Sequence, residues 1–511
     1  MADYTSSNKR LAKNTLLLYI RMFIMMSIGF ITSRYILQAL GVEDYGIQNV
    51  VGGLVSMFSL MSTALSASAG RFITYGIGKG DSEYLRRIFS TSINIHFILA
   101  ILVIIAIESI GVWFLNHRLT IAPNRLIAAN WVLQCSVVTF ATGLSSVSYN
   151  AAIIAHEKMS TYAYLSLFEA AYKLVIVYIL CNYTGDRLIL ISIFFMFSTI
   201  ITSFVYYIYC KRHFEECNYQ FIWDKSVFSE MSSFAGWNFI GTSAALMNNQ
   251  GVNIAINLFT NPTINAARGI AMQANGIVSQ FTNNFMTALR PQIIKDYSQG
   301  NLEHMHQLIF QGARFSYYLF MLLSVPLIFE TDTILMIWLG QIPEHTVLFL
   351  RLVLVLSLSD LLSNTLIIGQ AATGKIRNYQ IVVGGLLALN FPISYLFLKF
   401  HFFPEITIII AIVISQVCLF ARLLFLRRMI SLSMTSFLKK VYFNVLPVTF
   451  LSLPLPYCLL YFLEPGFIRL CIVAFCYIVS SLIMIYFLGL NKGERQLMMN
   501  LASKYIKKFQ R

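Results

Sequence analysis

Several side chains that can carry charge lie inside long apolar runs of this sequence. Arg21 and Arg34 lie in the first run. Glu169 and Lys173 lie four residues apart in the fifth run, in the order that favours an ion pair within one helix. Asp360 lies in the tenth run. An ionisable group in an apolar helix costs a few kcal/mol, so each of these residues needs a partner or a water-filled cavity.

Amide side chains gather on the seventh and eighth apolar runs. Asn249, Asn253 and Asn257 recur at i, i+4 and i+8 and therefore share one helix face, and Arg268 and Asn275 follow on the next run. Amides are unfavourable against lipid tails, whereas they line a water-filled cavity well. We therefore expect these side chains to line a substrate cavity together with the two arginines of the first run. Hydrogen bonding between the two helices is the alternative.

The types of these residues indicate two kinds of chemistry. A guanidinium group binds phosphate oxygens in a bidentate manner, so arginines in a cavity favour an anionic ligand. Snorkelling to the interface is the alternative, above all for Arg34 near the outer helix end. Asp360 has no basic residue one turn away and is the first candidate for ion coupling, with a structural role as the alternative. We interpret Glu169 and Lys173 as a self-neutralising pair, or else as a second site of ion coupling.

The composition of the sequence indicates which secondary-structure elements hold these side chains. The chain has 511 residues, of which 57% are hydrophobic and 12% are charged, against about 45–50% and about 25% in ordinary soluble proteins. Fourteen apolar runs, the second over residues 46–69, are each long enough for a spanning helix of about 20 residues. We predict an all-α polytopic membrane protein with about 14 transmembrane helices.

The net charge of +15 is spread over short segments between the apolar runs. A nucleic-acid-binding protein would gather such charge on one soluble face, so no nucleic-acid partner is expected. Most of the lysines and arginines fall in the alternate loops that share a side with both termini. The positive-inside rule therefore predicts a multi-pass protein of the bacterial inner (plasma) membrane with both termini in the cytoplasm.

Two loops of the first half recur in the second half. Gly80-Asp81-Ser82-Glu83 is matched by Gly300-Asn301-Leu302-Glu303, and the pattern A-x-x-K-apolar-x-x-Y begins at Ala155 and again at Ala372. Parallel repeats of this kind place a transported substrate between the two halves. The predicted organisation is an N-terminal six-helix lobe (1–210), a cytoplasmic linker (211–228), a C-terminal six-helix lobe (229–426), an additional helix pair (441–489) and a basic cytoplasmic tail (490–511).

Other chemistry finds little support. No loop is longer than about 25 residues, which leaves no room for a catalytic or nucleotide-binding domain, so neither enzymatic activity nor a cofactor is expected. The segment from Gly369 to Lys375 matches G-x-x-x-x-G-K, but Ile376 stands where a P-loop needs Ser or Thr. The eight cysteines form no C-x-x-C pattern, and no metal site is expected.

Three stretches resemble the polysaccharide and O-antigen exporters of the multidrug/oligosaccharidyl-lipid/polysaccharide superfamily. They are the L-G-x-x-x-Y-G pattern that starts at Leu40, the G-D-x-E loop at Gly80, and the segment 150–159. The resemblance implies a flippase that moves an undecaprenyl-diphosphate-linked oligosaccharide across the inner membrane for lipopolysaccharide O-antigen or capsule assembly. Alternating access would be coupled to H⁺ or Na⁺, in contact with membrane lipids and with a polysaccharide polymerase as a candidate partner. A cation-coupled multidrug antiporter on the same fold is the alternative, and its site should be acidic and aromatic.

Overall fold

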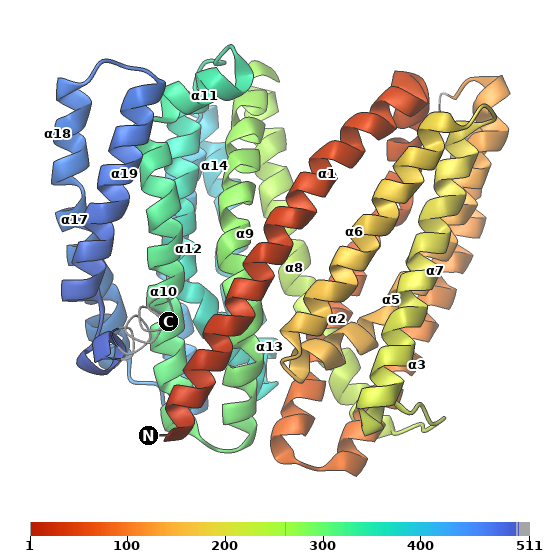
Figure 1. The fold of residues 1–511 in the computed structure, drawn as a ribbon, viewed down its shortest axis with the longest axis horizontal. Coiled ribbons are helices and arrows are strands. Elements are labelled where there is room, and N and C mark those ends of the chain that lie inside the picture. The colour runs from red at the N-terminus through yellow and green to blue at the C-terminus, as the bar shows by residue number, and fades with distance from the viewer. Residues whose placement is uncertain (1, 120, 261, 497–498, 500–511) are drawn as a thin grey trace, which may run out of the picture. The chain divides into compact units, whose positions relative to one another are not determined.

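The computed structural model describes residues 2–119, 121–260, 262–496 and 499. These residues form helices joined by short turns, and no strand occurs among them (Figure 1). Eleven helices are long and apolar enough to cross a membrane, or up to twelve when one bent pair counts as a single span. The predicted all-α polytopic fold is confirmed, whereas the count of about 14 spans is not.

The difference in the count has a physical reason. The predicted seventh and eighth spans lie in α8 (Lys225–Phe259) and α9 (Pro262–Ser298), which have 35 and 37 residues. At 1.5 Å per residue both helices are long enough to cross a membrane. Neither is among the eleven apolar helices, because both carry the amide side chains noted above. A criterion based on hydropathy alone misses helices that line a polar interior.

The chain divides into two compact units. The N-unit comprises Ala12–Thr242 and Ile294–Gly300, and the C-unit comprises Met1–Leu11, Ser243–Ile293 and Asn301–Arg511. The N-unit contains most of α1 (Ala2–Ser56), followed by α2 (Ser59–Lys79), α3 (Ser82–Ala106), α4 (Val112–His117), α5 (Leu126–Ala155), α6 (Met159–Asn182) and α7 (Arg187–His213).

The C-unit contains the start of α1 up to Leu11, the part of α8 from Ser243 onward, and most of α9. It continues with α10 (Leu302–Phe329), α11 (Thr331–Leu339), α12 (Thr346–Thr373), α13 (Arg377–Ala388), α14 (Asn390–Lys399) and α15 (Ile406–Ile430). After the short α16 (Met434–Phe437), the helices α17 (Phe443–Ser452), α18 (Pro454–Phe462) and α19 (Phe467–Met484) cover the additional pair that the sequence predicts.

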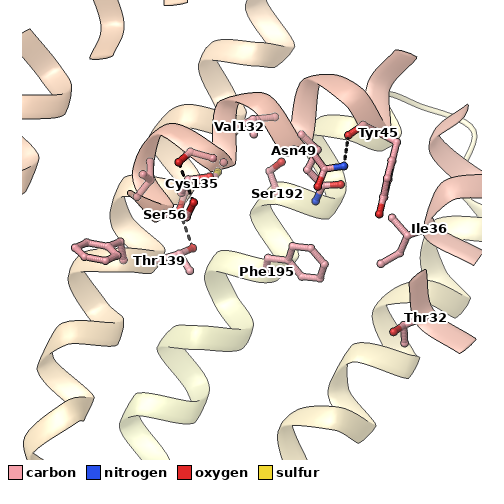
Figure 2. Close-up of a pocket in the computed structure, with 16 residues that line it drawn as sticks. Thr32, Ile36, Tyr45, Asn49, Ser56, Val132, Cys135, Thr139, Ser192 and Phe195 are labelled. Carbon is pink, nitrogen blue, oxygen red and sulfur yellow. Dashed lines mark hydrogen bonds between the residues drawn. The ribbon is translucent and has the colours of Figure 1, made fainter. Parts of the chain in front are cut away.

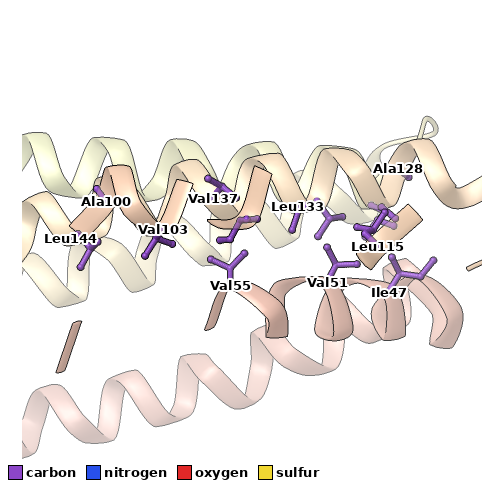
Figure 3. Close-up of a cluster of buried hydrophobic side chains, with 14 of the residues drawn as sticks. Ile47, Val51, Val55, Ala100, Val103, Leu115, Ala128, Leu133, Val137 and Leu144 are labelled. Carbon is purple, nitrogen blue, oxygen red and sulfur yellow. The ribbon is translucent and has the colours of Figure 1, made fainter. Parts of the chain in front are cut away.

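The region predicted as one span over 46–69 is broken. α1 changes direction at Gly41, runs on as the segment Glu43–Ser56, and is followed by α2 after a bend of 47°. One side of Glu43–Ser56 is anchored by Ile47, Val51 and Val55, which recur every four residues and pack in the apolar core formed with α3 and α5 (Figure 3). The other side of this segment is therefore free to line a cavity.

Gly41 should be required for the first of these bends. Its φ of 78° and ψ of 171° lie in a region that is essentially accessible only to glycine. A Cβ there would meet no atom within 4 Å, so any penalty of Gly41→Ala comes from the backbone alone. We expect Gly41→Ala to lower the unfolding free energy by about 1–3 kcal/mol.

Thermal unfolding in detergent micelles measures this effect. The matched control is Gly46→Ala in the same segment, where the Cβ also meets open space but φ is not left-handed. This control should be neutral or slightly stabilising, because alanine favours helix. Equal melting temperatures for Gly41→Ala and Gly46→Ala would contradict the requirement for glycine at position 41.

The repeated loops take matching backbone conformations in the two halves of the sequence. Gly80 and Gly300 are both left-handed, with φ of 71° and 75°. Each is followed by an N-cap residue: Asp81 accepts the Tyr84 N–H, and Asn301 accepts the His304 N–H. Glu157 and Gly374, which are 217 residues apart, are left-handed as well. The sequence repeat is therefore also a repeat of local structure, while the predicted domain boundaries stay a prediction.

The segment between α7 and α8 is tied to the N-unit. The Tyr219 hydroxyl donates to Asn94 Oδ1 of α3 (2.9 Å), and Asn94 Nδ2 donates to the Ile222 carbonyl (3.1 Å). Asp224 accepts hydrogen bonds from Ser226 at the start of α8, and the bond from the Ser226 hydroxyl holds the pKa of Asp224 below its ordinary value.

The described start of the predicted tail is tied to α10. The buried Arg314 donates to the Gly489 carbonyl (2.7 Å) and forms an ion pair with Glu494 (2.6 Å). Residues 497–498 and 500–511 of the predicted tail lie outside the described residues.

Candidate functional site

A pocket of about 280 Å³ in the C-unit brings predicted site residues together. Asn249 of α8, Arg268 of α9 and Asp360 of α12 all line it. Polar side chains from α12, α14 and α15 complete the wall: Asn364, Asn390, Thr407 and Ser415. Three predicted site residues from three different helices therefore share one cavity within this unit.

Arg268 is a buried cation of this pocket, with 4% of its surface exposed. Its guanidinium donates to Asn253 Oδ1 and, at 3.5 Å, to Asn249 Oδ1. No carboxylate oxygen of a described residue lies within 4.0 Å of it, and its Nε has no hydrogen-bond partner among them. A buried charge that is compensated only by neutral amides is costly, which makes this site receptive to an anion.

The remaining amides of the predicted stripe differ in their surroundings. Asn275 accepts a hydrogen bond from the Ser357 hydroxyl (2.8 Å) and so connects α9 to α12. Asn257 is exposed and is not among the residues that line the pocket. The structure thus brings Asn249, Asn253 and Arg268 into contact, whereas Asn257 lies apart from them.

Asp360 ends a chain of hydrogen bonds that crosses three elements. Ser415 Oγ of α15 donates to Asp360 Oδ1 (2.5 Å), and Ser359 Oγ donates to Ser415 Oγ (2.9 Å). Gln416 Nε2 donates to Ser359 Oγ (2.5 Å), and the Tyr442 hydroxyl donates to Gln416 Oε1 (3.3 Å). Every donor in this series of hydrogen bonds points toward the carboxylate. Because Tyr442 lies just before α17, the series connects Asp360 to the additional helix pair.

The pocket also contains a cation that sequence reasoning missed. Arg422 of α15 lines it and donates from Nε to the Tyr379 hydroxyl (2.9 Å). The basic residues near 422–428 are predicted to face the cytoplasm, and this prediction gave no reason to place Arg422 beside Asp360. Among the described lining residues, the charged groups are therefore two guanidiniums and one carboxylate.

Arg21 occupies a different environment in the N-unit. Its guanidinium lies 4.4 Å from the centroid of the Tyr162 ring of α6, a cation–π arrangement. Its Nε is buried without a hydrogen-bond partner, and no ion pair joins Arg21 to any described carboxylate. Glu169 and Lys173 form an ion pair within α6, with Nζ and Oε1 2.8 Å apart. Arg34 is exposed.

The N-unit holds a second pocket, of about 610 Å³, between α1, α5 and α7 (Figure 2). Its walls carry Tyr45, Asn49, Thr139 and Ser192. Tyr45 belongs to the pattern that starts at Leu40, but none of the four was predicted to line a cavity. The available signal was the pairing of Gln48-Asn49 with Gly52-Gly53 inside an apolar run. The predicted residues Arg21 and Arg34 do not line this pocket.

No protein-family model matches this chain, and no curated protein matches its sequence. Solved structures do match its fold. A MATE transporter in complex with MaD3S aligns with a TM-score of 0.71 at 14% identity, over 83% of this chain and 96% of that one. The Vibrio cholerae MATE transporter VcmN in its bent form aligns with a TM-score of 0.67 at 18% identity, over 84% and 98%.

A MOP superfamily transporter from Pyrococcus furiosus, described as having a binding pocket of reverse polarity, aligns with a TM-score of 0.66 at 13% identity, over 82% and 96%. At these identities the shared property is the fold. The chain therefore has the all-helical fold found in MATE transporters and in a further transporter of the MOP superfamily.

Proposed function

We propose that this chain, which has the fold of the MOP-superfamily transporters, exports an undecaprenyl-diphosphate-linked oligosaccharide across the inner membrane for surface polysaccharide assembly. The observation that carries the proposal is the buried Arg268, which is held by amides and has no described carboxylate within ion-pair distance. A guanidinium in that state can bind a diphosphate, because the phosphate oxygens supply the charge and the acceptors that the site lacks.

Arg21 supports the same substrate class from the N-unit. Its positive charge faces an aromatic ring and has no described acidic partner. A site for cationic drugs would be expected to hold unpaired carboxylates instead. With both termini in the cytoplasm, the carrier would receive its lipid-linked substrate at the cytoplasmic leaflet and release it outside, acting as a transporter rather than an enzyme. A polysaccharide polymerase is the partner that would consume the product.

Asp360 supplies a route for ion coupling by H⁺ or Na⁺. It shares the pocket of Arg268 and is not within 4.0 Å of any described cationic nitrogen. Binding of a cation at Asp360 would change the net charge of the pocket, and hence its affinity for an anion near Arg268. Such a linkage is reciprocal, so the ion state and the substrate affinity would control each other. The Glu169–Lys173 pair in the N-unit is the second candidate for this role.

A cation-coupled multidrug antiporter is the second candidate function. Asp360 favours it, because a carboxylate on a pocket wall can attract an organic cation. The solved structures with the same fold include MATE transporters, one of them described as a multidrug resistance transporter. The two candidates require opposite substrate charges.

The substrate charge can be tested in vesicles that contain the purified full-length protein. We expect outward movement of a fluorescent polyprenyl-diphosphate-linked oligosaccharide at a rate above that of protein-free vesicles, and no uptake of ethidium or tetraphenylphosphonium. Arg21→Ala should lower this export while the amount of protein in the membrane stays unchanged. Transport of the cationic dyes without glycolipid movement would overturn the proposal in favour of the antiporter.

A further inference from the structure

We infer that the N-unit pocket is a binding site for neutral sugar rings, and that it receives part of the glycan of the exported substrate. The inference rests on the proposed function and assigns the sugar portion to a place separate from the arginines. The pocket lies wholly within one unit, between the broken part of α1 and the helices α5 and α7 (Figure 2). Its volume of about 610 Å³ is within the range of small-molecule sites, about 300–1,000 Å³.

The first argument is the absence of charge. None of the sixteen described residues that line this pocket is Asp, Glu, Lys, Arg or His. A charged ligand would lose its hydration there and find no opposite charge in return, which is strongly unfavourable. A diphosphate and an organic cation are both poor occupants for this reason. A neutral ligand escapes that penalty.

The second argument is the orientation of the hydroxyl groups. Ser56, Thr139 and Ser192 each donate to a carbonyl of their own helix, at 2.8, 2.7 and 2.8 Å. A hydroxyl has one hydrogen and two lone pairs, so these oxygens remain available as acceptors. Asn49 likewise donates from Nδ2 to the Tyr45 carbonyl (2.8 Å), which leaves its Oδ1 as an acceptor. The walls therefore match a ligand rich in hydroxyl donors.

The third argument is the presence of two glycines that the fold alone does not explain. Gly52 and Gly53 lie inside a helix and line the pocket, and neither has a left-handed φ. A Cβ on either residue would meet no atom within 4 Å. Glycine in a helix interior costs about 0.5–1 kcal/mol relative to alanine. Close approach of a ligand to the backbone at Gly52 and Gly53 would explain why glycine is present despite that cost.

The helical segment that lines the pocket is also held in place by the apolar core, and the pocket wall offers apolar surfaces to the faces of a sugar ring. Ile47, Val51 and Val55 fix the far side of the same helical segment in the apolar core (Figure 3). The rings of Tyr45 and Phe195 stand on the pocket wall (Figure 2). Apolar and aromatic walls with a few placed polar groups are the usual make-up of a small-molecule site, and the C–H faces of a sugar can pack on such rings.

Saturation-transfer NMR on the purified full chain in nanodiscs tests the inference. The probes are lactose and methyl N-acetylglucosaminide as neutral sugars, glucuronate as an anion, and tetraphenylphosphonium as a cation. We expect saturation transfer to at least one neutral sugar and none to the charged probes. Gly53→Ala should weaken sugar binding by about tenfold or more, the effect of one misplaced methyl group in a ligand site.

Gly46→Ala is the matched control, because it makes the same change seven residues earlier in the same segment, outside the pocket lining. It should bind the sugar as the wild type does. Both variants should melt at or above the wild-type temperature, since alanine favours helix. Absence of sugar binding in the wild type, equal binding by Gly53→Ala, or a signal from tetraphenylphosphonium that Gly53→Ala removes would each overturn the inference.

Glycolipid export by the same variants separates this inference from the proposed function. Gly53→Ala should export more slowly than Gly46→Ala. Normal export by Gly53→Ala would overturn the sugar site and leave the proposed function standing. A wild-type protein that binds neutral sugars but moves no glycolipid would overturn the proposed function and keep the sugar site.

Discussion

Replacing Arg268 with alanine should reduce export of a diphosphate-linked glycolipid by about 10- to 100-fold. Hydrogen bonds to a charged group contribute about 1.5–3 kcal/mol, and each 1.4 kcal/mol is a factor of ten. The guanidinium is buried against Asn249 and Asn253, so water that fills the space left by the side chain cannot supply the lost positive charge. Initial rates in reconstituted vesicles, normalised to the amount of protein, measure the effect.

Two further variants distinguish substrate binding from a structural role of Arg268. Arg268→Lys keeps the charge but loses the planar fork, so it should recover only part of the rate. Arg351→Ala removes an arginine of α12 that is 39% exposed, pairs with Asp332 and donates to the Ile328 carbonyl. It should export normally, because Arg351 does not line the pocket and exposed ion pairs contribute little. Loss of folded protein in Arg268→Ala, or full activity in that variant, would contradict the role in binding.

The contacts that the sequence could indicate are those encoded in local spacing. A repeat of four residues places Asn249 and Asn253 on one helix face whatever the tertiary structure, and both contact Arg268 in the structure. The ion pair of Glu169 with Lys173 has the same origin. The all-helical fold follows from long apolar runs, since a backbone in lipid must satisfy its hydrogen bonds internally.

The features that could not be predicted depend on contacts between distant helices or on bends. The donor to Asp360 is Ser415, 55 residues further along the chain, and no spacing rule connects the two. The N-unit pocket exists because the chain bends at Gly41 and again before α2. Averaging hydropathy over residues 46–69 hides Gln48 and Asn49 among apolar neighbours and treats a broken helix as one span.

Asp360→Asn should slow ion-driven export by about 5- to 150-fold, the range of typical coupling free energies of about 1–3 kcal/mol. Asparagine keeps the shape of the side chain and an oxygen that can accept the hydrogen bond from Ser415, but it cannot take up or release a proton. The variant should therefore lose the dependence of export on external pH. Export from vesicles with an imposed proton gradient, compared between wild type and variant, measures the change.

The control for Asp360 is Ser415→Ala, which keeps the carboxylate and removes its donor. If Asp360 carries the coupling ion, Ser415→Ala should keep a pH-dependent rate, with the midpoint of the pH profile displaced, whereas Asp360→Asn should not respond to the gradient at all. If Asp360 serves only to hold α12 against α15, the order is reversed: the isosteric asparagine is nearly normal, and the loss of the Ser415 hydroxyl is the harmful change.

An Asp360→Asn protein whose export still rises with the proton gradient, as the wild type does, would exclude Asp360 from coupling. Coupling would then have to act through Glu169 or through sodium bound elsewhere, and Glu169→Gln with Lys173→Met would be the pair of variants to compare next.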